Sequence, residues 1–330
     1  MLEFSMIHVD ARHDALARWL SEHLQGASFS LAPASEDASF RRYFRATLGD
    51  GRSFVVMDAP PDKEDCRPFV HVARLLRDAG VHAPEIHAQD LARGFLLLSD
   101  LGRTTYLAAL HEGRAAALFR DATGALVRWQ LATRAGELPP YDGALLRREM
   151  ALFPEWYVGR HLGASLSARQ RDTLEQAFAL LAASALAQPA VFVHRDFMPR
   201  NLMVCDPNPG VLDFQDAVLG PITYDIVSLL RDAFISWDEA QVLDWTVRYW
   251  ESAKRAGLPV EADFGEFWRA FEWMGLQRHL KVLGIFARIG YRDGKPGYLG
   301  DTPRFMRYAR DVTQRYRPLH PLGELLEELE

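Results

Sequence analysis

The spacing of apolar residues changes within the first hundred residues. Residues 10–24 place Leu16, Trp19 and Leu20 on one face, which predicts an amphipathic helix. Beyond it, short apolar runs bounded by turn residues predict strands over 28–33, 40–48, 53–58, 85–88 and 94–99, and one helix over 66–79. We therefore expect this part of the chain to form a small sheet with a helix packed on it.

Helical spacing dominates from Leu101 onward. We expect helices over residues 104–112, 114–134, 143–152, 167–187, 222–234, 238–256, 263–290 and 302–317. A compact block at 191–214 interrupts them with short apolar strands separated by polar loops. Pro154 is expected to break a helix and leave a loop, and the acidic tail GELLEELE to form at most a solvated helix.

These patterns predict an α+β chain with two lobes. The small β-rich lobe would span residues 1–101 and the larger helical lobe residues 102–330, with a hinge near 100–102. No internal repeat or low-complexity stretch is visible in the sequence.

Composition narrows the class of protein. Of the 330 residues, 48% are hydrophobic and 25% charged, which is typical of soluble globular proteins. The net charge of -6 argues against a nucleic-acid binder. Cys66 and Cys205 lie far apart, with no spacing for a zinc site or a disulfide framework. Because no basic segment precedes an apolar run near the start, and no run is long enough to cross a bilayer, we expect a cytoplasmic protein.

The stretch His194-Arg195-Asp196-Phe197-Met198-Pro199-Arg200-Asn201 is the most informative part of the sequence. It places Asp196 and Asn201 at the two ends of one loop, and Asp213 follows at the end of the next strand. Phosphoryl transfer needs a carboxylate that orients or deprotonates the attacking hydroxyl, and oxygen ligands for Mg²⁺. The spacing therefore predicts Asp196 as that carboxylate and Asn201 and Asp213 as metal ligands. The alternative is a hydrogen-bonded polar turn in a β-hairpin.

The segments HRDFMPRN and VLDFQ, followed by Gly220-Pro221-Ile222-Thr223-Tyr224-Asp225, resemble the aminoglycoside phosphotransferase family. The resemblance implies a bilobal protein-kinase-like fold with a nucleotide-binding N-lobe and a catalytic, substrate-binding C-lobe. It implies ATP and Mg²⁺ as cofactors, and His194 and Asp225 as structural support for the loop. Alternatively, Asp225 is a first-turn acid favoured by the helix dipole.

A narrower resemblance covers nearly the whole chain. The segments SFRRYFR, FVVMDAPP, FLLLSDLG, RREMALFPEWYV, LQRHLKVLGIFAR and RDGKPGYL are similar to bacterial anomeric kinases of N-acetylmuramate and N-acetylglucosamine. This resemblance implies ATP-dependent phosphorylation of the C1 hydroxyl. The product would be an α-1-phosphate, which feeds UDP-sugar synthesis in peptidoglycan recycling.

The predicted nucleotide site departs from the kinase pattern. Residues 34–39 contain no glycine, and Met57 stands where kinases carry a phosphate-pairing lysine. Arg41 and Arg42 are the nearest cations, and one of them would face the phosphates; the alternative is solvated charge at a strand edge. The backbone around Asp100 and Leu101 would bind adenine, unless this is simply a buried strand leaving the lobe.

Candidate sugar ligands lie in two segments. Glu149 and Trp156 could hold hydroxyls and a ring face, although a helix end and a core aromatic residue would look the same. On the long helix, Gln277, His279, Lys281 and Arg288 are polar among core-spaced residues. A lactyl carboxylate would favour one of the cations, His279 or Lys281 among them; the alternative is an exposed helix face.

Two other functions remain open. One is phosphorylation of an aminoglycoside, choline or homoserine. Residues 147–160 hold three arginines and two glutamates, which favours a neutral or anionic substrate over a polycation. The other is a non-catalytic pseudokinase, which the missing lysine favours and the Asp196, Asn201 and Asp213 set opposes. We expect a monomer that binds ATP and a small amino sugar, and neither nucleic acid nor membrane.

Overall fold

The computed structural model describes residues 3–35 and 40–329 and falls into two compact units. The first, called here the sheet unit, comprises the chain up to Thr104 together with Met203–Asp216. The second, the helical unit, comprises Thr105–Leu202 and the chain from Ala217 onward. The α+β class predicted from the sequence is confirmed. Among the residues described, no helix is long and apolar enough to cross a membrane.

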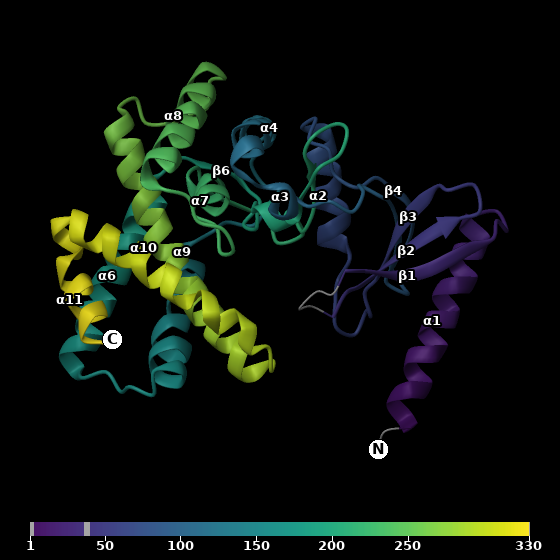
Figure 1. The fold of residues 1–330 in the computed structure, drawn as a ribbon, viewed down its shortest axis with the longest axis horizontal. Helices are drawn as coiled ribbons and strands as arrows, with labels where there is room; N and C mark the ends of the chain where they lie inside the picture. Colours follow the sequence, from purple (N-terminus) through teal and green to yellow (C-terminus); the bar gives the residue numbers. More distant parts are fainter. Residues whose placement is uncertain (1–2, 36–39, 330) are drawn as a thin grey trace. The chain divides into compact units, whose positions relative to one another are not determined.

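The sheet unit contains a five-stranded antiparallel sheet in the order β1-β2-β3-β5-β4 (Figure 1). Its central strand places Val56 opposite Phe44 on one side and Leu97 on the other. The predicted strands are confirmed within a few residues, as β1 Phe29–Ser35, β2 Arg42–Leu48, β3 Ser53–Asp58, β4 Ile86–Asp90 and β5 Phe95–Ser99.

Helix α1 (Glu3–His23) supplies the core of this sheet. Leu16, Trp19 and Leu20 are at most 2% exposed and pack in one cluster with Val56 and Leu97. The predicted apolar face is confirmed, although the helix begins seven residues before residue 10. Burial of this face holds α1 on the sheet.

The later segment of the sheet unit is attached by hydrogen bonds and by an aromatic contact. Val204 donates its N–H to the carbonyl of Thr104 at 2.8 Å, and Val211 donates to His82 at 2.7 Å. The ring of Phe214 lies 4.7 Å from that of Phe69, on α2 (Arg67–Asp78). The segment that carries Asp213 is therefore built into the sheet unit.

Each predicted helix of the helical unit has a counterpart in the structure. The elements of this unit are α3 Tyr106–Ala109, α4 Glu112–Leu131, α5 Gly143–Met150, η1 Phe153–His161, α6 Ala168–Ala187, β6 Ala190–Val193, η2 Pro199–Asn201, β9 Val218–Pro221, α7 Tyr224–Leu230, α8 Glu239–Arg255, α9 Phe264–Arg292, η3 Pro296–Asp301, α10 Thr302–Arg315, η4 Arg317–Leu319 and α11 His320–Glu328. The two-residue strands β7 Leu202–Met203 and β8 Gly210–Val211 pair with each other, and β6 pairs with β9.

Two predictions for this unit are wrong. Pro154 does not leave a loop, because it stands in the first turn of the π-helix η1, where a missing N–H costs no hydrogen bond. The acidic tail is not solvated all round. Helix α11 buries Leu322, Leu325 and Leu326, whose spacing of three and four residues forms one apolar face.

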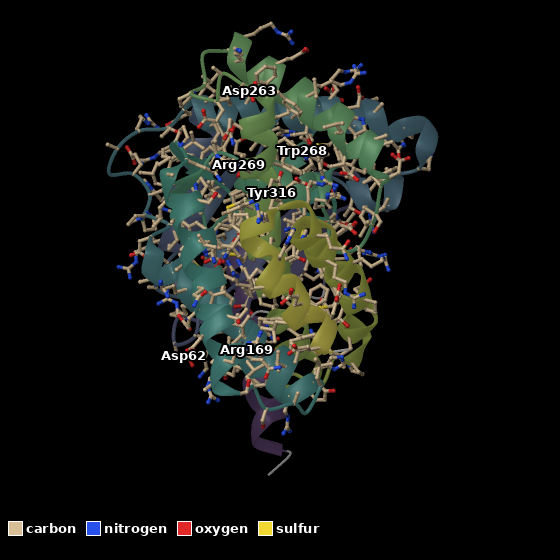
Figure 2. The ribbon with its side chains drawn as sticks, turned by 90° about the vertical axis from the view of Figure 1, so that its left-hand side faces the viewer. Asp62, Arg169, Asp263, Trp268, Arg269 and Tyr316 are labelled. Atoms are coloured by element: carbon tan, nitrogen blue, oxygen red, sulfur yellow. The ribbon has the colours of Figure 1, made fainter. Side chains whose placement is uncertain are left out.

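The long helix α9 is the centre of the helical unit and packs against η1, α6, α7 and α10 (Figure 1). Gln277, His279 and Lys281 are 0%, 2% and 8% exposed, so the alternative of an exposed helix face is wrong for them. In the first half of α9, Glu272 accepts a hydrogen bond from the hydroxyl of Tyr316. Tyr316 follows α10 and is labelled in Figure 2. The middle of α9 is therefore part of the core of the helical unit although it carries polar side chains.

We expect Gly284→Ala to destabilise the protein. An added Cβ would lie 2.5 Å from both the Cβ and the carbonyl oxygen of Leu152, where α9 crosses the start of η1. Overpacking of this kind costs about 1–3 kcal/mol. Urea unfolding followed by tryptophan fluorescence measures the change.

Gly124→Ala on α4 is the matched control. Its added Cβ would have only the flexible end of Arg128 nearby, at 3.9 Å, so helix propensity predicts stabilisation by up to about 1 kcal/mol. Equal changes in the two variants would contradict a close approach at Gly284.

Candidate active site

A loop between β6 and η2 carries the chemistry-bearing motif. The backbone carbonyl of Asp196 accepts hydrogen bonds from the Met198 N–H and from Asn201 Nδ2, both at 2.9 Å. The Asn201 N–H in turn donates to the carbonyl of Met198 at 2.8 Å. These bonds bring Asp196 and Asn201 together. Since the amide nitrogen of Asn201 is used by the loop, its oxygen is the end that could bind a cation.

Asp225 holds the start of the loop from the first turn of α7. Its buried carboxylate accepts the backbone N–H of His194 at 2.7 Å and that of Arg195 at 3.0 Å. Arg195 adopts φ 76°, a left-handed conformation that is costly for a residue with a side chain. Burial raises the pKa of Asp225 to about 7, although the two backbone donors and Arg278 oppose this rise.

The carboxylate of Asp196 is the unengaged group of the loop. Its backbone N–H donates to Nδ1 of His194 at 3.3 Å, and the buried His194 ring lies against Phe197. The half-buried Asp196 side chain forms no hydrogen bond or ion pair with the residues described. The loop therefore fixes the position of this carboxylate and leaves its oxygens available.

Behind the loop, Glu149 joins three side chains from distant segments. One of its carboxylate oxygens accepts Arg195 Nη2 at 2.5 Å and pairs with Lys281 Nζ at 2.9 Å, while the other accepts the hydroxyl of Tyr141. Burial would raise the pKa of Glu149, but the charges of Lys281 and Arg195 lower it to about 2. Glu149 is therefore a carboxylate at neutral pH.

Arg278 and Tyr224 complete this buried network. Arg278 Nη1 donates to the carbonyl of Arg195 at 3.2 Å, and its guanidinium lies 4.5 Å from the ring centroid of Tyr224. Lys281 Nζ donates to the Tyr224 hydroxyl at 3.1 Å. The sequence did not indicate Tyr141, Tyr224 or Arg278 as site residues. The sequence feature that could have indicated them is a polar group placed among residues whose spacing predicts burial.

The predicted sugar ligands do not all meet. Glu149 and Lys281 are brought together, but His279 faces away and packs its ring against Phe305 and Tyr308 of α10. Residues two positions apart on an α-helix point about 200° away from each other, which explains why the side chains of His279 and Lys281 diverge. Trp156 lies half-buried on η1.

In the sheet unit, Arg41 and Arg42 have different surroundings. Arg42 pairs with the buried carboxylate of Asp58, which also accepts Arg12 Nε at 2.7 Å. Arg41 precedes β2 and lies 3.9 Å from Glu64. Met57 is fully buried in β3.

The end of β5 is fixed by Asp100. Its carboxylate accepts Arg45 Nε at 2.6 Å, the hydroxyl of Ser53 at 2.7 Å and the N–H of Gly102 at 3.0 Å. Burial opposes ionisation, but these donors lower the pKa of Asp100 below its usual value. The side chain is thus committed to the protein, while Leu101 beside it is buried.

Asp213 stands two residues beyond β8 in the sheet unit. It has φ 62°, a second strained backbone position, and its Oδ1 accepts Gln215 Nε2 at 2.9 Å. Among the residues described, no group of three or more His, Cys, Asp or Glu side chains could hold a metal. Mg²⁺ commonly takes one or two protein oxygen ligands and completes its shell with water and phosphate oxygens.

A family model described as the phosphotransferase enzyme family matches residues 30–262. The chain belongs to this family. It is 56% identical over 331 residues to the N-acetylmuramate/N-acetylglucosamine kinase of Pseudomonas putida, covering 97% of each chain. It is 52% identical to the enzyme of the same name from Neisseria meningitidis serogroup B, covering 96% of each chain. The chain is accordingly a phosphotransferase.

Solved structures show the same fold at low sequence identity. A choline/ethanolamine kinase family protein from Mesorhizobium loti is 15% identical, with a TM-score of 0.62 over 96% of this chain and 99% of that one. The ADP-bound aminoglycoside phosphotransferase APH(2'')-Ib is 14% identical, with a TM-score of 0.59 over 90% and 98%. The kinase-like fold expected from the sequence is confirmed.

We expect Glu149→Gln to lower stability in a pH-dependent way. A folded pKa of about 2, against an ordinary value of 4.5, stabilises the fold above pH 4.5, and this contribution is lost as the pH falls toward 2. The difference in unfolding free energy between wild type and variant should be about 3 kcal/mol larger at pH 6 than near pH 2. Urea unfolding across this range measures it.

Glu175→Gln serves as the control for this titration. Glu175 forms an exposed ion pair with Arg147 at 3.2 Å, which contributes about 0–1 kcal/mol. A Glu149→Gln difference that does not change with pH would show that Glu149 is not ionised by its neighbours.

Proposed function

We propose that the chain is a sugar kinase that transfers the γ-phosphate of ATP to the C1 hydroxyl of N-acetylmuramate and N-acetylglucosamine. The unengaged carboxylate of Asp196, fixed by a strained loop, is the observation that carries the proposal. The names of the relatives at 52–56% identity support these sugars as substrates. The α-1-phosphate would be consumed in the cytoplasm by a nucleotidyltransferase that makes UDP-sugars for peptidoglycan recycling.

In the proposed mechanism, Asp196 accepts a hydrogen bond from the attacking hydroxyl and takes its proton. As the new oxygen–phosphorus bond forms, the bond between the γ-phosphorus and the oxygen bridging it to the β-phosphate breaks, and ADP leaves. Asp225 keeps the loop in place through the N–H groups of His194 and Arg195. Glu149 acts as a positioning residue, because its carboxylate is occupied by Tyr141, Arg195 and Lys281. Trp156 remains the candidate aromatic surface for the sugar ring.

Asn201 and Asp213 are the proposed ligands of Mg²⁺. When bound, the ion would neutralise phosphate charge during transfer. The amide oxygen of Asn201 and the carboxylate of Asp213 are hard ligands of the kind that Mg²⁺ prefers.

The sheet unit would supply the remaining nucleotide contacts. Arg41 is the proposed phosphate ligand in place of the missing lysine, since Arg42 is held by Asp58. The backbone at Asp100 and Leu101 would bind the adenine edge, with Met57 in the core of the sheet beneath.

A coupled ADP-release assay with N-acetylmuramate, N-acetylglucosamine and kanamycin tests the proposal. We expect turnover with both amino sugars and a phosphorus NMR signal of an acid-labile anomeric phosphate. Turnover with kanamycin alone would assign an aminoglycoside acceptor, and no turnover with any acceptor would indicate a pseudokinase.

In the same assay Asp196→Asn should lose roughly 10²- to 10⁴-fold in kcat. Asp172→Asn, an exposed change on α6, should match wild type.

Calorimetric titration with Mg·ATP tests the nucleotide site. Asp213→Ala should weaken binding by at least about tenfold, because one charged metal ligand is lost. The exposed neighbour Asp216 provides the control variant Asp216→Ala. Unchanged affinity in Asp213→Ala would refute its role as a ligand.

The same titration distinguishes the two arginines. Arg41→Met should weaken ATP binding by roughly 10- to 100-fold, the effect of losing one charge-assisted contact. Arg42→Met should instead destabilise the sheet unit, because among the described residues Arg12 would be the remaining ion-pair partner of the buried Asp58. Wild-type affinity in Arg41→Met would require another cation at the phosphates.

A further inference from the structure

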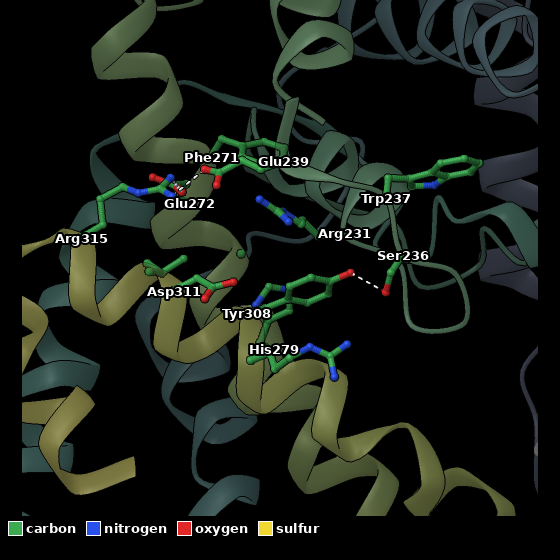
Figure 3. A pocket seen from close by; sticks show the side chains of 13 residues that line it. Arg231, Ser236, Trp237, Glu239, Phe271, Glu272, His279, Tyr308, Asp311 and Arg315 are labelled. Atoms are coloured by element: carbon green, nitrogen blue, oxygen red, sulfur yellow. Dashed lines mark hydrogen bonds and ion pairs between the residues drawn. The ribbon is translucent and has the colours of Figure 1, made fainter. Parts of the chain in front are cut away.

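A cavity of about 200 Å³ lies in the helical unit among α9, α10 and the segment between α7 and α8 (Figure 3). Its wall is unusually rich in charge, with Arg231, Arg307 and Arg315 facing Glu239, Glu272 and Asp311. The cavity is large enough for a molecule of the size of a sugar. None of these residues belongs to the loop that carries Asp196.

The charges on the wall are not all paired with one another. Arg315 is committed, because it pairs with Glu239 at 2.5 Å and also with Glu272. Arg231 reaches in between Glu272 and Tyr308 (Figure 3), and it makes no ion pair or side-chain hydrogen bond with the residues described. Its guanidinium lies over the Tyr308 ring, 5.1 Å from the centroid. Arg231 is therefore a half-buried cation available to a ligand.

His279 adds a second unused group to the wall. It is 2% exposed, and within the described part of the chain neither ring nitrogen has a hydrogen-bond partner. Burial, together with the charges of Arg231 and Arg278, keeps the pKa of His279 well below its ordinary value. The neutral ring offers one donor and one acceptor, which are costly to leave unused when buried.

Two hydroxyl side chains, those of Tyr308 and Ser236, are hydrogen-bonded to each other in the wall of the cavity. Tyr308 donates its hydroxyl hydrogen to Ser236 Oγ at 2.9 Å. The segment carrying Ser236 is fixed by the buried carboxylate of Asp232, which accepts the N–H groups of Phe234 at 2.8 Å and Ile235 at 3.1 Å. These hydrogen bonds hold this side of the cavity in place.

The end of α7 with the residue that follows it, and α9, contribute residues both to the cavity and to the contacts of the catalytic loop. Ser228 donates to the carbonyl of Arg195 at 3.4 Å, and Arg231 follows Ser228 by three residues. On α9, Arg278 donates to that same carbonyl, and its neighbour His279 lines the cavity. The residues that bind the Arg195 carbonyl and the residues that line the cavity therefore belong to the same two segments of chain.

We propose that this cavity receives the carboxylate-bearing side of the acceptor sugar, with Arg231 as the ligand of that carboxylate and His279 as a hydrogen-bond partner. This inference rests on the proposed function and deepens it. N-acetylmuramate carries a lactyl carboxylate that N-acetylglucosamine lacks, so Arg231 determines the preference between them. Lys281, the cation that the sequence favoured for this role, is occupied by Glu149.

The test is the selectivity ratio, defined as kcat/KM for N-acetylmuramate divided by kcat/KM for N-acetylglucosamine. Arg231→Met should lower the ratio by roughly 10- to 100-fold, the effect of one charge-assisted contact. Arg231→Lys should lower it less, because the charge remains while the planar fork is lost. Arg248→Met, which removes an exposed arginine from α8, should keep the wild-type ratio.

A general disturbance of the fold would reduce both constants together and leave the ratio unchanged, which would overturn the inference. If the wild type phosphorylates neither sugar, the proposed function fails separately. Calorimetric titration with N-acetylmuramate then decides the inference alone. Weaker binding by Arg231→Met than by wild type supports it, whereas equal binding, or no binding by wild type, overturns it.

Discussion

The left-handed backbone at Arg195 is the constraint on which the active-site loop depends. A residue with a side chain leaves this conformation unless other contacts hold it. Asp225 accepts the two backbone N–H groups around it, and Ser228 and Arg278 bind its carbonyl. The loop is thereby held at its backbone by α7 and α9, and the carboxylate of Asp196 is not needed for support.

The Glu149 network gives the same loop a second attachment through the side chain of Arg195. Removing the carboxylate of Glu149 would cost most, because two buried cations would then lose the charge that they share. The network draws on α5, the loop and α9, so it makes the loop position depend on how these elements pack. The position of the loop that carries Asp196 and the stability of the helical unit are therefore coupled.

The sequence predicted the parts of the site that lie close together along the chain. Asp196 and Asn201 were identified from a spacing within one loop, and the structure joins them through the Asp196 carbonyl. The partners of Glu149 were not predictable, since Tyr141, Arg195 and Lys281 meet only through tertiary packing. Periodicity predicted the helices well, but it could not show that Pro154 begins a helix or that Lys281 is buried.

The sheet unit is assembled from two stretches of chain separated by about a hundred residues. During synthesis, Phe69 on α2 emerges long before Phe214, the ring that covers it. The sheet with α1 can form first, but Phe69 on α2 stays without this ring until Thr105–Leu202, the first part of the helical unit, has been synthesised. The sheet unit is therefore complete only after part of the helical unit exists, and until then the nascent chain exposes an apolar side chain.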